Sequence, residues 1–285
     1  MLSSLYLVVI YSMSVRCDVR SKDAKYQVGT SGFMVSQSQW SKLSCLNCIE
    51  LNSSFYRIPG DSTIASLNKL PSNVNVVIKA SKYITHIKRL NDVKDAWEKL
   101  WAQISKLGSR LVCVLFQLPP TFNKTDVNMG RIRAMKSYLP HDMSYAFEFR
   151  NRSWLEDSTY DIMRDLGFCV VGTYIVKRES TNWVGTMPPG LFIPPKTASF
   201  NYIRIHGKKG WKGELSEREL DKIQGELSKQ KTSRSYVMFN NTFFDKRSDT
   251  CSINDVSVRY AAVCNAAEFA SNLATTTKLR VVDEM

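Results

Sequence analysis

Residues 200–206 read FNYIRIH, and this stretch carries the pattern from which the fold can be predicted. Side chains two apart in a β-strand project to the same face, so Arg204 and His206 share one face while the isoleucines on either side of Arg204 cover the other. Burying charge is costly unless the charge is paired or used. We therefore expect a strand that holds its polar side chains on one inner face.

Two other stretches repeat this pattern. CIELN places Glu50 and Asn52 two apart, and YAFEFR does the same with Glu148 and Arg150. Three such pairs in one chain indicate strands whose inner ends converge on a polar site. That architecture is typical of an enzyme pocket, although it names no reaction.

Eight strand-like segments can be marked along the chain, most of them β-branched or aromatic and ended by a polar residue or a turn signal. They are 26–30, 48–52, 74–79, 111–117, 145–150, 168–173, 200–206 and 236–240. Helical periodicity lies between them, most clearly at 92–107, where apolar residues form one stripe. Alternating strands and helices indicate parallel β-α-β units, and eight strands in a chain of 285 residues favour a single closed (β/α)8 barrel of the TIM type.

Two places depart from a regular barrel. The connection between the first two strands is short, so we expect an irregular first β-α unit. Residues 175–199 carry four prolines and no helical period, so we expect a loop in place of the helix after the sixth strand. We predict one domain, residues 25–275, with an N-terminal extension at 1–24 and a C-terminal tail at 276–285.

Seven motifs then stand in a fixed order along the chain. They are GTSGF (29–33), ELNSSFYRIP (50–59), IKASKYITHIKRL (78–90), LFQLPPTF (115–122), FEFRNRSW (147–154), YIRIHG (202–207) and YVMFNNT (236–242). Together they resemble the domain-of-unknown-function-72 family, the YecE-like proteins, from about Tyr26 to about Ala270. The resemblance implies a TIM-type barrel and brings no settled activity. The chain departs from the family pattern at Phe33, where a Trp is usual, near Thr173, where an Asp is usual, and in an insertion around 243–252.

The formal net charge is +13, from 39 Lys and Arg against 26 Asp and Glu. Such an excess favours anionic partners, which include nucleic acid, a membrane surface and phosphorylated or carboxylated small molecules. The basic residues are spread along the chain, so we interpret the charge mainly as a solvated surface. A nucleic-acid face stays open as an alternative.

The active site of such a barrel lies at the C-terminal ends of its strands. There we predict Glu50, Glu148 and His206 as catalytic acid and base groups, because burial beside opposite charges can separate pKa values. The predicted substrate-binding residues are Asn52, Lys79, His86, Gln117, Arg150, Arg204 and Asn240. The cations would hold an anionic group and the amides would orient hydroxyl groups.

This set suits a small anionic, hydroxyl-rich molecule such as a sugar phosphate, with isomerase, lyase or hydrolase chemistry. Three alternatives stay open at this point. The charged pairs could be structural ion pairs that fill a polar barrel end. The protein could bind or process nucleic acid and other phosphodiesters, or it could be a barrel that binds a ligand without catalysis.

Glu50, Glu148 and His206 are also the residues that would hold a divalent metal. The chain has three histidines, without HxH or HxxxH spacing, so we expect no metal site. No glycine-rich fingerprint follows a strand, so we expect no nucleotide cofactor. The seven cysteines are odd in number and scattered, which does not indicate a disulfide framework.

Residues 2–15 are apolar, but a helix that spans a bilayer needs about 20 apolar residues. No Lys or Arg precedes the stretch and its cleavage pattern is poor for a signal peptide. We therefore expect no transmembrane span. Secretion would expose the sequons at Asn52 and Asn240 to glycosylation at the mouth of the predicted pocket, where a glycan would block it, so we expect an intracellular protein. Secretory or organelle targeting by residues 1–17, and the oligomeric state, are left open by the sequence.

Overall fold

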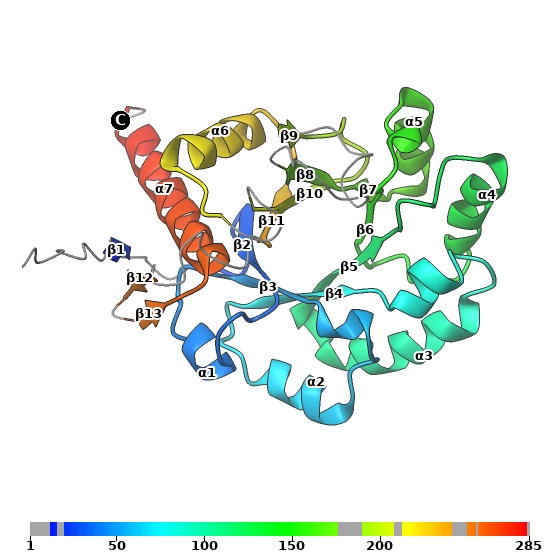
Figure 1. Cartoon of the computed structure of the whole chain (residues 1–285), viewed down its shortest axis with the longest axis horizontal. Helices are drawn as coiled ribbons and strands as arrows, with labels where there is room; N and C mark the ends of the chain where they lie inside the picture. Colours follow the sequence, from blue (N-terminus) through cyan, green and yellow to red (C-terminus); the bar gives the residue numbers. More distant parts are fainter. Residues whose placement is uncertain are drawn as a thin grey trace, which may run out of the picture.

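The structure, a computed structural model, describes residues 12–15, 20–175, 190–207, 213–240, 250–254 and 256–283. Among these residues, ten strands form one curled sheet in the order β7-β6-β5-β4-β3-β2-β11-β10-β8-β9. Every neighbouring pair is parallel except β8 and β9. The predicted α/β class with a parallel sheet is confirmed (Figure 1).

The strands lie close to the predicted segments. Their bounds are β2 (Tyr26–Ser31), β3 (Cys48–Leu51), β4 (Asn75–Lys79), β5 (Leu111–Gln117), β6 (Tyr145–Glu148), β7 (Cys169–Val170), β8 (Gly172–Ile175), β9 (Gly190–Phe192), β10 (Phe200–Ile205) and β11 (Arg234–Phe239).

The predicted sixth strand is divided into β7 and β8, with only Val171 between them. The first half pairs with β6 and the second half with β10, so this one segment joins the two sides of the curled sheet. The Val171 N–H still donates to the carbonyl of Phe147 at 2.9 Å. A strict (β/α)8 barrel is not what forms, because the segment changes partner at Val171 and the sheet acquires an antiparallel strand, β9.

The described helices cover the outside of the sheet (Figure 1). They are α1 (Gln37–Trp40), α2 (Asp61–Asn68), α3 (Lys94–Ile104), α4 (Asp126–Met135), α5 (Asp157–Leu166), α6 (Glu217–Ser228) and α7 (Ala261–Asp283), with short turns η1 (Ser53–Phe55), η2 (Tyr83–Ile87), η3 (Ser105–Arg110) and η4 (Arg152–Trp154). The predicted stripe of α3 is buried at Trp97, Leu100 and Ile104. No described helix is both long and apolar enough to cross a membrane.

The first β-α unit is short, as expected, since α1 is a single turn of four residues. Of the region predicted to form a loop after the sixth strand, residues 176–189 lie outside the described residues. The described remainder holds β9, an antiparallel strand that the sequence did not predict. Gly172 permits this pairing, because a Cβ there would lie 2.9 Å from the carbonyl oxygen of Phe192.

A second, three-stranded sheet has the order β1-β12-β13, from β1 (Ser12–Val15), β12 (Thr250–Ile253) and β13 (Val256–Val258). β1 lies in the predicted N-terminal extension and pairs in parallel with β12, which ends the predicted insertion. A disulfide joins Cys251 in β12 to Cys264 in α7. The sequence analysis missed this bond, because the parity of a cysteine count says nothing about which thiols the fold brings together.

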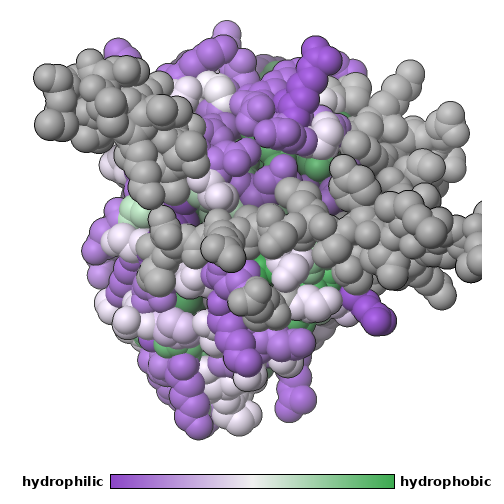
Figure 2. Space-filling model, turned by 90° about the vertical axis from the view of Figure 1, so that its left-hand side faces the viewer, coloured by the Kyte–Doolittle hydropathy of each residue, from purple (hydrophilic) through white to green (hydrophobic). Residues whose placement is uncertain are grey.

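Two apolar layers hold the sheet. The outer layer lies between the strands and the helices, and includes Phe116 and Phe147. The inner layer fills the curl of the sheet with the side chains Cys48, Val77, Cys113, Leu115, Ala146, Cys169, Val171, Phe200, Tyr202, Tyr236 and Met238. The face seen in Figure 2 is mostly hydrophilic where described residues show, which agrees with a charge spread over a solvated surface.

Candidate active site

The inner face of the curled sheet changes from apolar to polar within two residues on several strands. Two positions after the inner-layer residues Cys48, Val77, Leu115, Ala146 and Tyr202 stand Glu50, Lys79, Gln117, Glu148 and Arg204. Because side chains two apart share a face, the apolar floor of the interior is continuous with a polar layer above it. All five polar residues lie at the C-terminal ends of their strands, where the sequence analysis placed the site.

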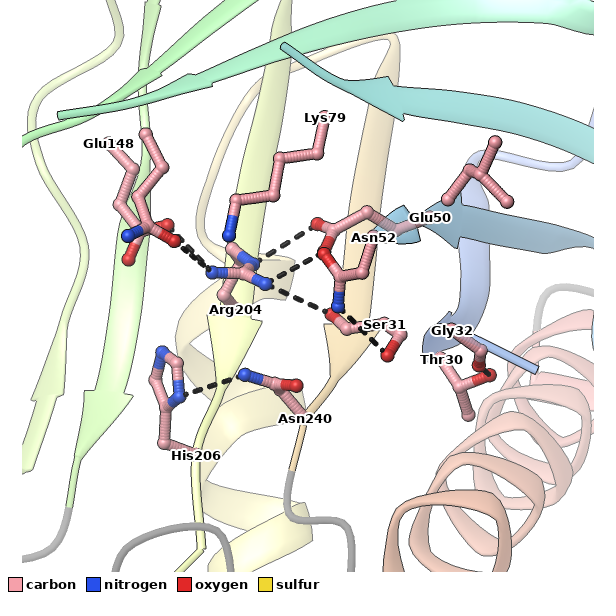
Figure 3. A network of polar contacts seen from close by, with 12 residues as sticks. Thr30, Ser31, Gly32, Glu50, Asn52, Lys79, Glu148, Arg204, His206 and Asn240 are labelled. Atoms are coloured by element: carbon pink, nitrogen blue, oxygen red, sulfur yellow. Dashed lines mark hydrogen bonds and ion pairs between the residues drawn. The ribbon is translucent and has the colours of Figure 1, made fainter. Parts of the chain in front are cut away.

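Arg204 is the centre of this polar layer (Figure 3). Its Nε donates to Glu50 Oε2 at 3.1 Å and its Nη2 to Glu50 Oε1 at 2.7 Å. Its Nη1 donates to Glu148 Oε2 at 2.8 Å and to Gln117 Oε1 at 3.2 Å. Burial alone would lower the pKa of Arg204, but Glu50 and Glu148 outweigh it and raise the pKa, so the guanidinium is always charged.

Glu50 is fully buried and its two oxygens are both occupied. Besides the two bonds from Arg204, Oε2 accepts a hydrogen bond of 2.6 Å from the hydroxyl of Tyr202. Burial first, and then the charge of Glu50, hold the pKa of Tyr202 well above its usual range, so the phenol remains a donor. The sequence analysis missed Tyr202, although its place two residues before Arg204 on the same face is a signal that could have found it.

Glu148 connects Arg204 to the second buried guanidinium, since its Oε1 pairs with Arg150 Nη2. Burial alone would raise the pKa of Glu148, but Arg150 and Arg204 together lower it to about 2. Glu148 is therefore ionised throughout the physiological range. Two carboxylates and two guanidiniums thus form a buried group whose formal charges cancel.

His206 lies beside this group, with Nε2 at 3.5 Å from Arg150 Nη2 and Nδ1 at 3.4 Å from the Asn240 side-chain amide. Burial first, and then the charges of Arg150 and Arg204, hold the pKa of His206 well below its usual range. The ring is therefore uncharged at neutral pH. Both neighbours are donors, the Arg150 guanidinium and the Asn240 Nδ2, and an uncharged ring has one nitrogen without a proton, so it can accept from only one of them.

Lys79 extends from the end of β4, and its amine is directed toward Arg204 (Figure 3). Burial first, and then the charge of Arg204, lower its pKa to about 7. Its Nζ lies 4.3 Å from the centroid of the Phe55 ring, a contact that stabilises an ammonium by about 0.5–2 kcal/mol and so offsets only part of the burial. Within the described part of the chain, no hydrogen bond or ion pair joins Nζ to another residue.

The remaining predicted residues lie at the rim. Asn52 is half-buried, and its Nδ2 donates to the carbonyl of Ser31 at 3.0 Å. His86, in η2, has Nδ1 at 2.9 Å from the Thr85 hydroxyl and its ring edge-on to Phe55. Burial first, and then Lys79, lower the pKa of His86 to about 4. The structure gathers eight of the other nine predicted residues around Arg204, and the ninth, His86, lies against Phe55.

A groove of about 530 Å³ opens beside the site and shares Phe55 with it. Its lining residues are Phe55, Tyr56, Ile58, Ser81, Lys82, Tyr83, Ile87, Lys88, Asp92, Asp95, Ala96 and Lys99. Tyr56 is 81% exposed and Tyr83 is 49% exposed. Two exposed aromatic rings therefore line a groove that reaches Phe55, the residue whose ring contacts Lys79. Among the described residues, no group of three or more His, Cys, Asp or Glu is arranged to hold a metal ion.

Comparisons with known proteins agree with the seven motifs. Residues 41–252 match a family model described as "Protein of unknown function DUF72". The chain is 28% identical over 174 residues to the UPF0759 protein YunF of Bacillus subtilis (strain 168), a match that covers 57% of this chain and 60% of that relative.

Two solved structures have a similar fold. A DUF72 family protein of Thermotoga maritima MSB8 aligns with a TM-score of 0.67 and 26% identity, over 88% of this chain and 100% of that one. A DUF72 family protein of Enterococcus faecalis V583 aligns with a TM-score of 0.67 and 18% identity, over 87% of this chain and 95% of that one. The second likeness shows the fold alone.

Proposed function

The chain belongs to the DUF72 family, whose description assigns no activity, and we propose that it is an enzyme that performs acid–base chemistry on a small anionic, hydroxyl-rich molecule such as a sugar phosphate. The reaction would be of the isomerase, lyase or hydrolase type. One observation carries the proposal: two carboxylates, two guanidiniums, an amine and an imidazole meet at one end of the curled sheet. Figure 3 shows the carboxylates, the amine and the imidazole around one of these guanidiniums, that of Arg204. Buried charges are costly unless they are paired or used. Pairing accounts for the carboxylates and guanidiniums, so the amine and the imidazole beside them, whose pKa values are both lowered, are what favours a functional site.

The proton transfers fall to Lys79 and His206 in this proposal. An acid or base must change its protonation state near the working pH, and Lys79, with a pKa of about 7, meets that condition. The uncharged ring of His206 can only accept a proton, because its pKa is held well below its usual range. Glu148 stays ionised, so we assign it, together with Glu50, to positioning the guanidiniums rather than to the catalysis first predicted.

Substrate binding falls to Arg150 and the rim amides. The Arg150 guanidinium lies between Glu148 and His206 and is the group we assign to the substrate's anion, because guanidinium matches phosphate and carboxylate geometry. Asn52 and Asn240 are half-buried at the rim and would orient hydroxyl groups. Arg204 donates a hydrogen bond to Gln117, and we assign these two residues to holding the binding groups in place beneath the substrate.

A thermal-shift screen tests this proposal, with sugar phosphates, sugar acids, nucleotides and divalent metals as separate additions. A ligand at 100 times its Kd stabilises the folded state by about 2.7 kcal/mol. We expect an anionic polyol to stabilise the wild type and the surface control Arg164→Gln, and to have no effect on Arg150→Gln or Glu148→Gln. Equal stabilisation of all four proteins would mean that the ligand binds away from Arg150 and Glu148. If none of the anions tested stabilises the wild type, the proposal is wrong.

Turnover separates an enzyme from a barrel that only binds. Each stabilising compound is incubated with the wild type and its consumption is followed by NMR. We expect conversion that falls at least tenfold in Lys79→Met while Arg164→Gln converts normally. A compound that binds at Arg150 and remains unchanged in every incubation would support the non-catalytic alternative.

The groove supports a second candidate function, the binding of single-stranded nucleic acid. Exposed rings stack on bases, and cations follow the phosphate backbone. Tyr56 and Tyr83 supply the rings, and Lys82, Lys88 and Lys99 line the same groove without an ion pair to any described residue. We expect affinity for an oligonucleotide that falls steeply with salt and is lost in Tyr56→Ala with Tyr83→Ala. Binding that does not respond to salt or to these substitutions excludes it.

A further inference from the structure

We infer that Lys79 is a covalent catalytic residue, whose uncharged amine adds to the carbonyl carbon of an aldehyde or ketone substrate. The inference rests on the proposed function and narrows its substrate class, from an anionic polyol to an anionic carbonyl compound. Three observations carry it: the balance of charge around Lys79, the absence of a described partner for its amine, and the position of that amine at the mouth of the site.

The charge around Lys79 is already balanced without it. Arg204 is bonded to Glu50 and to Glu148, and Glu148 also pairs with Arg150. These four groups are all buried, and their formal charges cancel. A proton on Lys79 would add one positive charge, and neither of the two carboxylates of this group is left to neutralise it. The uncharged amine is therefore the form that this environment favours.

The amine has no structural task within the described residues. Both oxygens of Glu50 and both oxygens of Glu148 are occupied by guanidiniums, so Lys79 is not needed to hold either carboxylate. Its Nζ faces the Phe55 ring at 4.3 Å and approaches Arg204. A half-buried lysine whose lone pair is free and whose amine lies at a strand end has what a nucleophile requires.

The position of the amine allows a substrate to reach it. Lys79 is half-buried rather than enclosed, and Phe55 beneath it lines the groove of about 530 Å³. A carbonyl group over Lys79 would place the rest of its molecule toward Arg150 or into the groove. His86, Glu50, Glu148, Arg150 and Arg204 are the titratable and charged groups that act on Lys79 or face it from the neighbouring elements.

The chemistry balances without an oxidant or a metal. The amine lone pair forms the new C–N bond while the carbonyl π electrons move to oxygen, and one proton passes from nitrogen to that oxygen to give a carbinolamine. The hydroxyl then takes one proton from solvent and leaves as water, while the nitrogen lone pair forms the C=N bond of a cationic iminium. The resulting iminium carries one positive charge, which the anionic group of the substrate itself would balance.

Reductive trapping tests the inference. The protein is incubated at pH 7 with glyceraldehyde 3-phosphate, pyruvate, glyoxylate or formaldehyde, each with cyanoborohydride, which reduces the iminium to a stable secondary amine. Peptide mass spectrometry then looks for a gain equal to the probe less one oxygen. The matched control is Lys69, an exposed lysine on the surface, and the variants are Lys79→Arg and Lys69→Arg.

We expect the Lys79 peptide to be labelled at least about tenfold faster than the Lys69 peptide, because an ordinary lysine has a pKa near 10.4 and is almost wholly protonated at pH 7. Lys79→Arg loses the fast adduct and Lys69→Arg retains it. Labelling of Lys79 no faster than Lys69 with all four probes overturns the inference. Both peptides come from the wild type, so the result stands even if Lys79→Arg fails to fold.

One further compound separates this inference from the proposed function. Sorbitol 6-phosphate has an anion and hydroxyl groups but no carbonyl. If it stabilises the wild type through Arg150 while Lys79 stays unlabelled, the imine is excluded and the proposed function stands. If Lys79 is labelled rapidly but no anion in the panel stabilises the protein, the reactive amine is supported and the anionic substrate is excluded.

Discussion

Arg204 and Glu50 form a two-point ion pair across the interior of the curled sheet, with Nη2–Oε1 at 2.7 Å and Nε–Oε2 at 3.1 Å. The two residues are 154 positions apart in the chain. Each is part of a predicted pair on a different strand, and β3 and β10 are not neighbours in the sheet. The contact therefore forms only when the sheet curls, and it links the stability of the fold to the geometry of the site.

This ion pair predicts a non-additive mutant cycle. Arg204→Met leaves two buried carboxylates with one guanidinium, and Glu50→Gln leaves two guanidiniums with one carboxylate. Each single change should lower the free energy of unfolding by about 3–5 kcal/mol, because it leaves an uncompensated buried charge. The double variant restores the balance and should lose less than the sum of the two. Denaturant unfolding measures all four proteins, and strict additivity would refute the coupling.

Tyr202→Phe should weaken the fold at the same site. The phenol donates to the Glu50 carboxylate at 2.6 Å, and hydrogen bonds to charged groups contribute about 1.5–3 kcal/mol. Tyr236→Phe is the matched control, because that hydroxyl lies 3.5 Å from the Val112 carbonyl and otherwise meets Arg234 rather than a carboxylate. Its loss should cost less than that of the Tyr202 hydroxyl. Equal losses of unfolding free energy in the two variants would show that Tyr202 acts through its ring alone.

The lowered pKa of Lys79 predicts that the free energy of unfolding rises with pH. Its pKa is lowered to about 7 in the folded protein from the ordinary value of 10.5, so between these values the unfolded chain binds more protons than the folded one. Stability then increases with pH across that window. From pH 7 to 9 the gain attributable to Lys79 is about 2 kcal/mol.

The comparison with Lys79→Met isolates this gain, because the other titrating groups are common to both proteins. Urea unfolding at pH 7, 8 and 9 should show a steeper rise for the wild type than for the variant. Parallel curves would mean that the folded protein leaves the pKa of Lys79 near its ordinary value.

Gly29→Ala should disrupt the pairing of β2 with β3. A Cβ on Gly29 would lie 1.7 Å from the carbonyl oxygen of Cys48 in β3, so the backbone would have to move and we expect a loss of more than about 3 kcal/mol. Gly130→Ala in α4 is the control, because a Cβ there meets nothing within 4 Å and removing glycine from a helix interior should stabilise by about 0.5–1 kcal/mol. Opposite signs in thermal unfolding are the expected result.

Reduction of the Cys251–Cys264 disulfide should destabilise the protein without changing the site. The bond closes a segment of 13 residues, and loops of about 15 residues are stabilised by about 3 kcal/mol in the chain-entropy model. Dithiothreitol should therefore lower the wild-type melting temperature and leave that of Cys251→Ala with Cys264→Ala unchanged. Ligand-induced shifts should persist in the double variant, and their loss would connect the disulfide to the binding site.

Local pattern alone was enough to place most of the candidate site. Alternation along a strand is a property of the extended backbone, so the spacing of Glu148 and Arg150, or of Arg204 and His206, determines which side chains share a face whatever surrounds them. The strand count and the order of the motifs then indicated a parallel α/β fold and the family. These features depend on residues close together in the chain, which is why they could be predicted.

The tertiary structure decided how those side chains divide their tasks. Which carboxylate Arg204 would hold, that Tyr202 would donate to Glu50, and that Lys79 would be left outside a balanced set of charges all depend on strands brought together by the curl of the sheet. The charge state of a buried group depends on its burial and on every neighbouring charge at once. The sequence by itself determined which side chains share a strand face, and only their packing determined which of them meet and which of them carries the proton.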